Sequence, residues 1–258
     1  MKINKIFANG CSFTYAGGLH WEEVKEIYKK ELDIDIDNHL DYAYPNVIAK
    51  QLGVDVVNNS APGGSSNRLV RTTYEYLYEN KDNLEGTFFI LEIPPYWRDE
   101  LYSNELKRTI NLTISSIHSY TDITDFANGN PREDLPRIYK DLTNYFYNFV
   151  EDNFEKNKMM SSFFGLISYI KLLGLNYLII DSGDFQMYLK NHNLSNDDYN
   201  FIWFDKDALC NWMNKNDVLI KHETNGLSKD EHLSIKGNKI VANRIIKHLY
   251  EENQTSIS

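Results

Sequence analysis

The sequence predicts an α/β protein whose parallel sheet is covered by helices on both faces. Segments typical of strands alternate with segments typical of helices along the chain. Most of the strand-like segments are continuous apolar runs, as expected for strands that are buried on both faces. With 258 residues, of which 42% are hydrophobic, the chain can form one large domain with a full core.

Five segments have the composition of strands. The clearest is residues 87–93, an apolar run that is stopped by Pro94 and Pro95. The last is the weakest, because it contains only a short apolar stretch. The expected strands are residues 2–8, 54–58, 87–93, 176–181 and 218–220.

Helices are expected where apolar residues recur at helical spacing. The segment 44–52 ends at Gly53, a residue type that commonly ends helices. The final helix has one apolar face. The expected helices of the sheet layers are residues 44–52, 67–79 and 235–250.

Residues 98–160 do not continue this alternation. They begin with a charged run, pass through a segment of mixed character, and contain a helix breaker at residues 128–131. Helices are expected at about 135–154 and 159–173. We interpret 98–160 as a helical insertion, a crossover or lid, in a single domain that spans residues 1–258.

Composition excludes several classes of partner. The formal net charge of −10 argues against nucleic acid and against a strongly anionic polymer as substrate. Two cysteines, Cys11 and Cys210, are too few for a disulfide framework or a cysteine-based zinc site. No apolar stretch has the length of a secretory signal or a membrane helix. A cytoplasmic protein without membrane contact is expected, and a virion-associated protein would have the same features.

A serine near the start of the chain is a candidate nucleophile. The first expected strand runs into a tight turn that presents Ser12. A serine hydroxyl needs a histidine to take its proton and a carboxylate to orient that histidine. Asp230 and His232 lie just ahead of the last expected helix and have these chemistries. The alternative is that Ser12 and Asp230 only cap helices.

The remaining histidines lack a comparable setting and are expected to be solvated. They are His20, His39, His118, His192, His222 and His248.

A glycine pair follows the second expected strand. Gly63 and Gly64 would let the backbone approach a ligand, and amides at the start of the next helix can hold a developing oxyanion. The alternative is a plain turn in which Ser65 or Ser66 caps the helix. Asp181 and Asp184 could hold a cation, but no third ligand is evident, so no metal site is expected.

The order of these blocks resembles that of the SGNH (GDSL-type) hydrolases, and is most similar to the SGNH-like proteins of bacteria and tailed phages. In that family the nucleophile lies in a Gly-Asp-Ser turn after the first strand, unlike the Gly-x-Ser-x-Gly elbow of α/β-hydrolases. Here Cys11 stands where the family usually has Asp. The closing block, residues 230–237, resembles the final block of the family closely.

The resemblance implies a flavodoxin-like three-layer sandwich with a five-stranded parallel sheet. It also implies that Ser12 attacks an ester carbonyl, that His232 acts as general base, and that Asp230 orients His232. The backbone amides of Ser12 and Gly64 would form part of the oxyanion hole, with Gly63 as the fallback for Gly64.

The chain departs from the family at the third block. A Gly-x-Asn segment, whose Asn donates to the oxyanion, is absent from residues 91–98. Losing one such donor typically costs about 10²–10³ in rate. We expect Asn67 to substitute in the oxyanion hole, or Arg98 to reach the site as a substrate-binding residue; otherwise the enzyme is slow or inactive.

The expected function is that of a serine esterase that cleaves a small acyl ester through an acyl-Ser12 intermediate and needs no cofactor. By family analogy, O-acetyl groups on a carbohydrate are the leading substrate. The aromatic content of 14% would suit sugar stacking. The alternatives are an O-acyltransferase on the same fold, and a non-catalytic carbohydrate-binding or virion-associated module.

Overall fold

A computed structural model describes residues 2–95, 98–103, 108–112, 152–183, 199–205 and 207–255. Its centre is a parallel five-stranded sheet with the order β2-β1-β3-β6-β7. This is the strand order of flavodoxin-like folds. The strands are β1 (Lys5–Asn9), β2 (Asp55–Asn58), β3 (Thr87–Ile93), β6 (Asn176–Asp181) and β7 (Phe201–Ile202).

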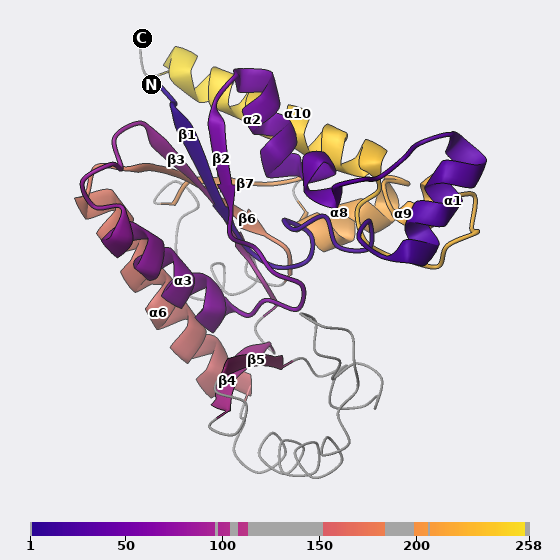
Figure 1. The fold of residues 1–258 in the computed structure, drawn as a ribbon. Helices are drawn as coiled ribbons and strands as arrows, with labels where there is room; N and C mark the ends of the chain where they lie inside the picture. The colour runs from indigo at the N-terminus through magenta and orange to yellow at the C-terminus, as the bar shows by residue number, and fades with distance from the viewer. Residues whose placement is uncertain are drawn as a thin grey trace.

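Helices cover both faces of the sheet, so the predicted three-layer α/β class is confirmed (Figure 1). One face packs against α2 (Tyr44–Leu52), α8 (Leu209–Lys215) and α10 (Ile235–Thr255). The other packs against α3 (Ser66–Glu79) and α6 (Asp152–Leu172).

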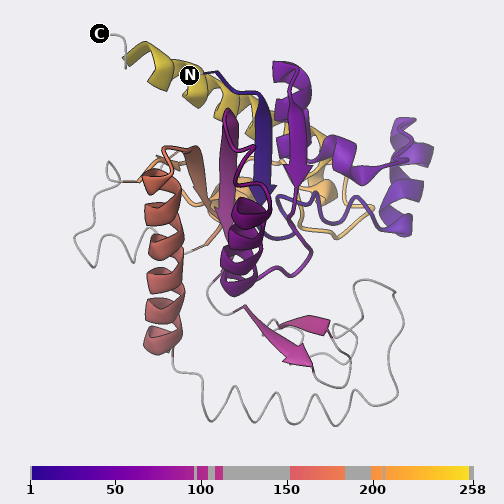
Figure 2. The same cartoon turned by 60° about the vertical axis from the view of Figure 1, so that its left-hand side comes forward.

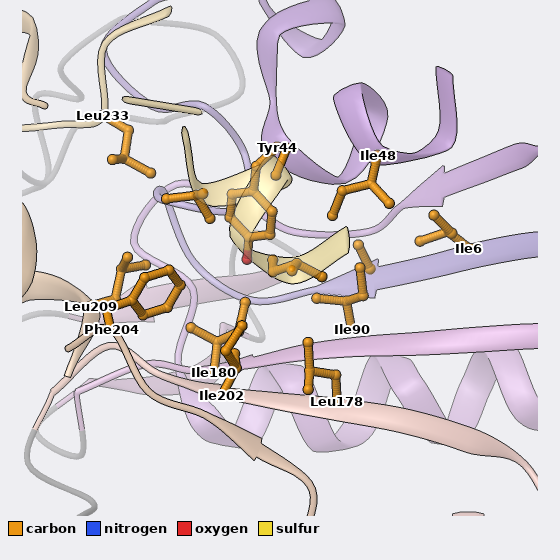
Figure 3. Packing of buried hydrophobic residues seen from close by; sticks show 14 of the residues in the cluster. Ile6, Tyr44, Ile48, Ile90, Leu178, Ile180, Ile202, Phe204, Leu209 and Leu233 are labelled. Carbon is orange, nitrogen blue, oxygen red and sulfur yellow. The ribbon is translucent and has the colours of Figure 1, made fainter. Parts of the chain in front are cut away.

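Burial on both faces explains the continuous apolar runs of the strands. All seven residues of β3 are buried. Ile90 packs in one cluster with Tyr44 and the α2–α10 layer (Figure 3), and Phe88 belongs to the same cluster. Phe89 instead packs with residues of α3 and α6. A strand between two helical layers needs apolar side chains at every position.

The predicted fifth strand is wrong. The fifth strand of the sheet is β7, which pairs with Ile179 and Ile180 of β6. The segment predicted as a strand instead makes an isolated bridge between Leu219 and Leu233 and continues into α9 (Ile220–Glu223). It is apolar because it packs beside the loop that carries His232, and not because it enters the sheet.

The insertion begins with a β-hairpin, so a purely helical insertion is wrong for this part. β4 (Asp99–Ser103) pairs antiparallel with β5 (Arg108–Leu112). The hairpin lies beyond the carboxyl ends of the strands (Figure 2), and Glu100 binds Arg71 of α3 through two hydrogen bonds of 2.8 and 2.9 Å. The helix predicted at 135–154 lies outside the described residues, except for its last three residues in α6.

A segment without predicted structure connects β1 to α2. It contains α1 (Glu22–Leu32) and a 3₁₀ helix, η1 (His39–Tyr42). Its apolar residues form a separate cluster with Ile220 and Ile235, which places α1 beside α9 (Figure 1). Among the described residues, no helix combines the length and apolar character that crossing a membrane requires.

Candidate active site

The serine block and the glycine block pack against each other at the carboxyl end of the sheet. A methyl group added at Gly64 would lie 2.8 Å from the carbonyl oxygen of Gly10 and 3.5 Å from Cα of Cys11. The N–H of Asn59 donates to the carbonyl of Ala8 at 2.8 Å. Only glycine at position 64 allows this approach of the two turns.

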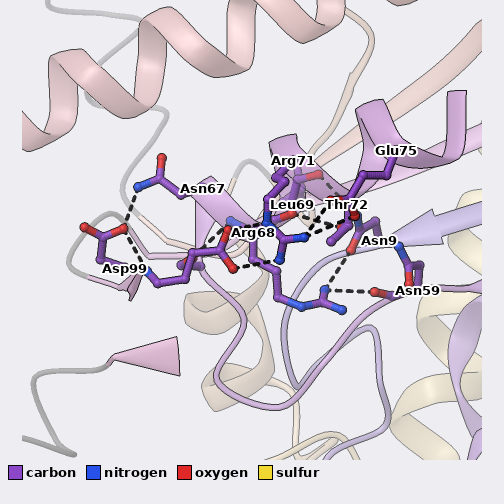
Figure 4. Close-up of polar contacts among 11 residues, drawn as sticks. Asn9, Asn59, Asn67, Arg68, Leu69, Arg71, Thr72, Glu75 and Asp99 are labelled. Carbon is purple, nitrogen blue, oxygen red and sulfur yellow. Dashed lines mark hydrogen bonds and ion pairs between the residues drawn. The ribbon is translucent and has the colours of Figure 1, made fainter. Parts of the chain in front are cut away.

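Polar contacts anchor the end of β1 to α3 (Figure 4). The buried amide of Asn9 donates to the hydroxyls of Thr72 (2.8 Å) and Thr73 (3.0 Å). The half-buried guanidinium of Arg68 donates to the carbonyl of Asn59 (2.9 Å) and to Oδ1 of Asn9 (3.3 Å). The turn after β1 is therefore fixed at its base.

Ser12 and His232 both lie against Gly17. A methyl group at Gly17 would lie 2.8 Å from Cβ of Ser12 and 2.9 Å from Cδ2 of His232. The backbone N–H of Gly17 donates to the carbonyl of Ser12 at 2.6 Å, which holds this glycine against the serine. Two residues that are 220 positions apart in the sequence are thus close neighbours beside one glycine.

The Ser12 hydroxyl does not point at the imidazole in this conformation. Its one hydrogen-bond contact within the described residues is to Sγ of Cys11, at 4.0 Å. Ser12 is 6% exposed. Long or poorly aligned catalytic hydrogen bonds are common in structures without substrate.

Asp230 orients His232. Its Oδ1 lies 3.0 Å from Nδ1 of His232 and accepts the backbone N–H of His232 at 2.8 Å. Burial of Asp230 opposes its ionisation, but the hydrogen bonds and charge of His232 outweigh burial and lower the pKa of Asp230. We assign the proton to Nδ1, which leaves Nε2 free to accept the serine proton.

The loop that carries this pair is held by backbone hydrogen bonds. The N–H of Ile220 donates to the carbonyl of His232 (2.9 Å), and that of Lys221 donates to the carbonyl of Asp230 (3.1 Å). The segment around α9 thereby serves as a support for the acid and the base.

The expected oxyanion donors differ in their availability. The N–H of Gly64 donates to the carbonyl of Ala61 at 3.0 Å, in a turn with Pro62 and a positive φ (65°) at Gly63. The N–H groups of Ser12 and Gly63 have no acceptor within the described part of the chain. Gly63, the fallback, is therefore better placed to donate than Gly64.

Asn67 is engaged elsewhere. Its amide nitrogen donates to Oδ1 of Asp99 in β4 at 2.5 Å (Figure 4). Asn67 fastens the hairpin to α3, and the oxyanion role expected for it has no support in this geometry.

Arg98 brings a guanidinium with two unsatisfied nitrogens to this end of the sheet. Its Nε and Nη1 are buried and have no hydrogen-bond partner among the described residues. Burial and, after it, the neighbouring Glu92 raise the pKa of the Cys11 thiol to about 12, while the Arg98 charge acts in the opposite direction. The guanidinium thus acts on the residue next to Ser12.

Glu92 was not predicted as part of the site. It is fully buried at the end of β3, and its carboxylate accepts the N–H of Cys11 (3.2 Å), the N–H of Thr14 (3.0 Å) and the hydroxyl of Thr14. Its other oxygen accepts the Cys11 thiol at 2.9 Å. The available signal was a lone carboxylate in an otherwise apolar strand.

An aromatic group beside His232 was also missed. The ring centroids of Phe13 and Trp21 lie 5.7 and 6.2 Å from that of His232. Those of His20 and His39 lie 5.5 Å apart, and both side chains are partly buried, so the expectation that they are solvated is wrong. Their proximity depends on the fold of residues 15–43, which no local pattern indicated.

Within the described ranges, no group of three or more His, Cys, Asp or Glu side chains is arranged to hold a metal ion. Oδ1 of Asp181 accepts the N–H of Gly183 at 2.9 Å, and Asp184 lies outside those ranges. Comparison of the sequence with protein-family models and with curated proteins gave no match.

Proposed function

We propose that this protein is a serine esterase that cleaves a small acyl ester, with O-acetyl groups on a carbohydrate as the leading substrate. One observation carries the proposal: Ser12 and His232 come together beside Gly17, and His232 is bound to the buried Asp230 through Nδ1. A nucleophile, a base and an orienting carboxylate in this order are the parts that acyl transfer through serine requires.

In the proposed reaction, Nε2 of His232 takes the proton of Ser12 as Oγ attacks the ester carbonyl. The tetrahedral intermediate then expels the alcohol, which receives the proton from His232. Water then attacks the carbonyl of acyl-Ser12 and gives a proton to His232. The second tetrahedral intermediate breaks its bond to Oγ, which takes that proton back from His232, and the carboxylic acid leaves. Asp230 remains ionised throughout, in agreement with its lowered pKa.

The developing oxyanion would be held by the N–H groups of Ser12 and Gly63. Their freedom from other acceptors supports this assignment. Arg98 would supply the contact for which the resembled family uses Asn, since its buried donors lack a partner. Preorganised donors of this kind account for a large part of catalysis in acyl transfer.

A fluorophosphonate probe tests the proposal directly, because it reacts with an activated serine. We expect labelling at Ser12, mapped by mass spectrometry, that disappears in Ser12→Ala and in His232→Ala. Ser66→Ala is the matched control, because Ser66 is a second buried serine and follows the glycine turn that packs against the turn of Ser12. This variant should be labelled like the wild type.

A folded wild-type protein that is not labelled would overturn the proposal. It would favour the alternative, a non-catalytic carbohydrate-binding or virion-associated module. Two observations already support this alternative: the N–H of Gly64 is bound to Ala61, and Ser12 makes no hydrogen bond to His232. If Ser12 is labelled, product analysis with an acyl donor and a sugar acceptor distinguishes a hydrolase from an acyltransferase.

A further inference from the structure

An exposed tryptophan lies against His232. The Trp21 side chain is 47% exposed, and its ring meets the imidazole edge-on, with centroids 6.2 Å apart and an interplanar angle of 76°. A large exposed aromatic ring beside a candidate catalytic base is a typical feature of a binding surface.

Trp21 occupies a position where another residue would serve the helix better. It is the N-cap of α1 and makes no side-chain capping hydrogen bond. Ser, Thr, Asp or Asn at an N-cap stabilises a helix relative to residues that cannot cap. Local helix stability therefore does not explain the tryptophan.

The helix behind Trp21 is held firmly against the base. Val24 and Tyr28 of α1 pack with Ile220 and Ile235, which flank the loop of Asp230 and His232. The Tyr28 hydroxyl also donates to Glu223 at 2.8 Å. The indole is thus presented from a rigid element at a defined place beside His232.

Two imidazoles with unused hydrogen-bonding capacity complete this surface. The His20 ring lies 5.9 Å from the Trp21 ring and 5.5 Å from the His39 ring. Neither imidazole makes a hydrogen bond within the described residues, and of their nitrogens only Nδ1 of His20 and Nε2 of His39 are buried. Nε2 of His20 and Nδ1 of His39 are therefore not fully buried.

The chemistry of the reaction determines which part of the substrate would contact the surface formed by Trp21, His20 and His39. The base that activates Ser12 must afterwards protonate the leaving oxygen, so the alcohol of the ester lies against Nε2 of His232. The Trp21 ring packs edge-on beside the His232 ring. A flat indole with neighbouring imidazoles suits an alcohol that has both an apolar ring face and several hydroxyl groups.

We propose that Trp21, His20 and His39 form the subsite for the leaving alcohol, and that this alcohol is a carbohydrate ring. The inference rests on the proposed function, because it takes the role of His232 from it. Trp21 stacks on the sugar, and the two imidazoles bind its hydroxyl groups.

The kinetic test compares methyl 6-O-acetyl-glucopyranoside with ethyl acetate in a pH-stat. Trp21→Ala should lower kcat/KM for the acetylated glycoside by roughly 3- to 10-fold, mainly through KM, and by clearly less for ethyl acetate. Trp21→Phe should restore part of the loss. Tyr78→Ala is the control, since Tyr78 is an exposed aromatic residue (77%) on α3 and should behave as the wild type. Equal losses on both esters, or no loss, would overturn the subsite.

A binding measurement separates this inference from the proposed function. Saturation-transfer NMR of the acetylated glycoside with Ser12→Ala protein requires no catalysis. We expect binding that is lost in the Ser12→Ala, Trp21→Ala double variant. If the glycoside binds but Ser12 of the wild type is not labelled, the subsite is supported and the esterase proposal is refuted. If Ser12 is labelled but the glycoside does not bind, the esterase proposal is supported and the subsite is refuted.

Discussion

The carboxylate of Glu92 accepts hydrogen bonds from both the backbone N–H (3.2 Å) and the thiol (2.9 Å) of Cys11. Glu92 is the last residue but one of β3, and Cys11 is the residue before Ser12. The raised pKa of Cys11, about 12, keeps its thiol protonated at neutral pH and able to donate. One buried carboxylate thus ties the central strand to the turn of the candidate nucleophile.

Replacing Glu92 by Gln should weaken both the fold and the site. Both carboxylate oxygens of Glu92 now accept hydrogen bonds, whereas glutamine has an NH₂ group in place of one of them. That NH₂ group would face a donor of Cys11 or Thr14, and a buried donor left unpaired costs about 1–3 kcal/mol. We expect a loss of that size in the free energy of unfolding, measured in urea, and slower fluorophosphonate labelling of Ser12. Glu85→Gln, at an exposed position just before β3, is the control. If Glu92→Gln unfolds and reacts like the wild type, Glu92 does not position the turn.

Gly17→Ala should separate the serine from its base. The added methyl group would lie 2.8 Å from Cβ of Ser12 and 2.9 Å from Cδ2 of His232, closer than side-chain carbons approach, so one of the two must move. A displacement of about 1 Å at a reacting group can cost 10²-fold in rate. We expect a loss of that order in the labelling rate of Ser12.

Gly165→Ala in α6 is the matched control for that change, because its nearest atom is 3.9 Å away. It should leave the labelling unchanged. Full activity in Gly17→Ala would show that Ser12 and His232 do not act together beside this glycine.

Local signals made much of the sheet predictable. β3 (Thr87–Ile93) begins and ends where the sequence predicts, because Pro94 and Pro95 stop it. α2 (Tyr44–Leu52) also matches, because Gly53 adopts the left-handed conformation that ends the helix. Asp230 and His232 were found because both lie in one short block, where the hydrogen bond between them is itself local.

The features that were missed depend on contacts between distant segments. β7 is two residues long and is a strand only because the edge of β6 is beside it. Glu92 belongs to the site only because the turn after β1 folds over it. His20 joins His232 through the packing of α1 on the loop after α9, which no spacing within residues 15–43 encodes.

Arg98→Gln should separate activity from stability. If the guanidinium contacts the substrate or the oxyanion, its loss should reduce kcat/KM for an ester by about 10²–10³. Since buried donors without a partner are costly, and Nε and Nη1 of Arg98 have none among the described residues, the same change should keep or raise the thermal midpoint. Both quantities can be measured on one preparation, and Arg98→Lys should recover little activity because lysine lacks the planar fork.

Arg71→Gln gives the contrasting control. Arg71 is paired with Glu75 and Glu100, so its loss should lower the midpoint slightly and leave Ser12 reactive. If Arg98→Gln also lowers the thermal midpoint slightly and leaves Ser12 reactive, Arg98 is a structural residue.

His20 should make the protein less stable as the pH falls. Burial, followed by the nearby His39 and His232, lowers the pKa of His20 to about 4. In the unfolded chain its pKa returns to about 6.5, so between these values the unfolded state binds more protons than the folded state. Stability therefore decreases as the pH falls through this window. The lowered pKa of His39 acts with the same sign.

The measurement is the thermal midpoint from pH 7 to pH 4.5 for the wild type and His20→Phe, which keeps a ring beside Trp21. We expect the wild-type midpoint to fall more steeply, because the variant has no imidazole at position 20 to protonate. The range ends at pH 4.5 to keep the titration of Asp230 out of the comparison. The pKa of Asp230 is about 3.9 in the unfolded chain and lower in the folded protein, so the stability that its carboxylate contributes is lost only when the pH falls below about 3.9. Parallel curves would mean that His20 titrates alike in both states, and that its ring is not held in a desolvated site beside His232.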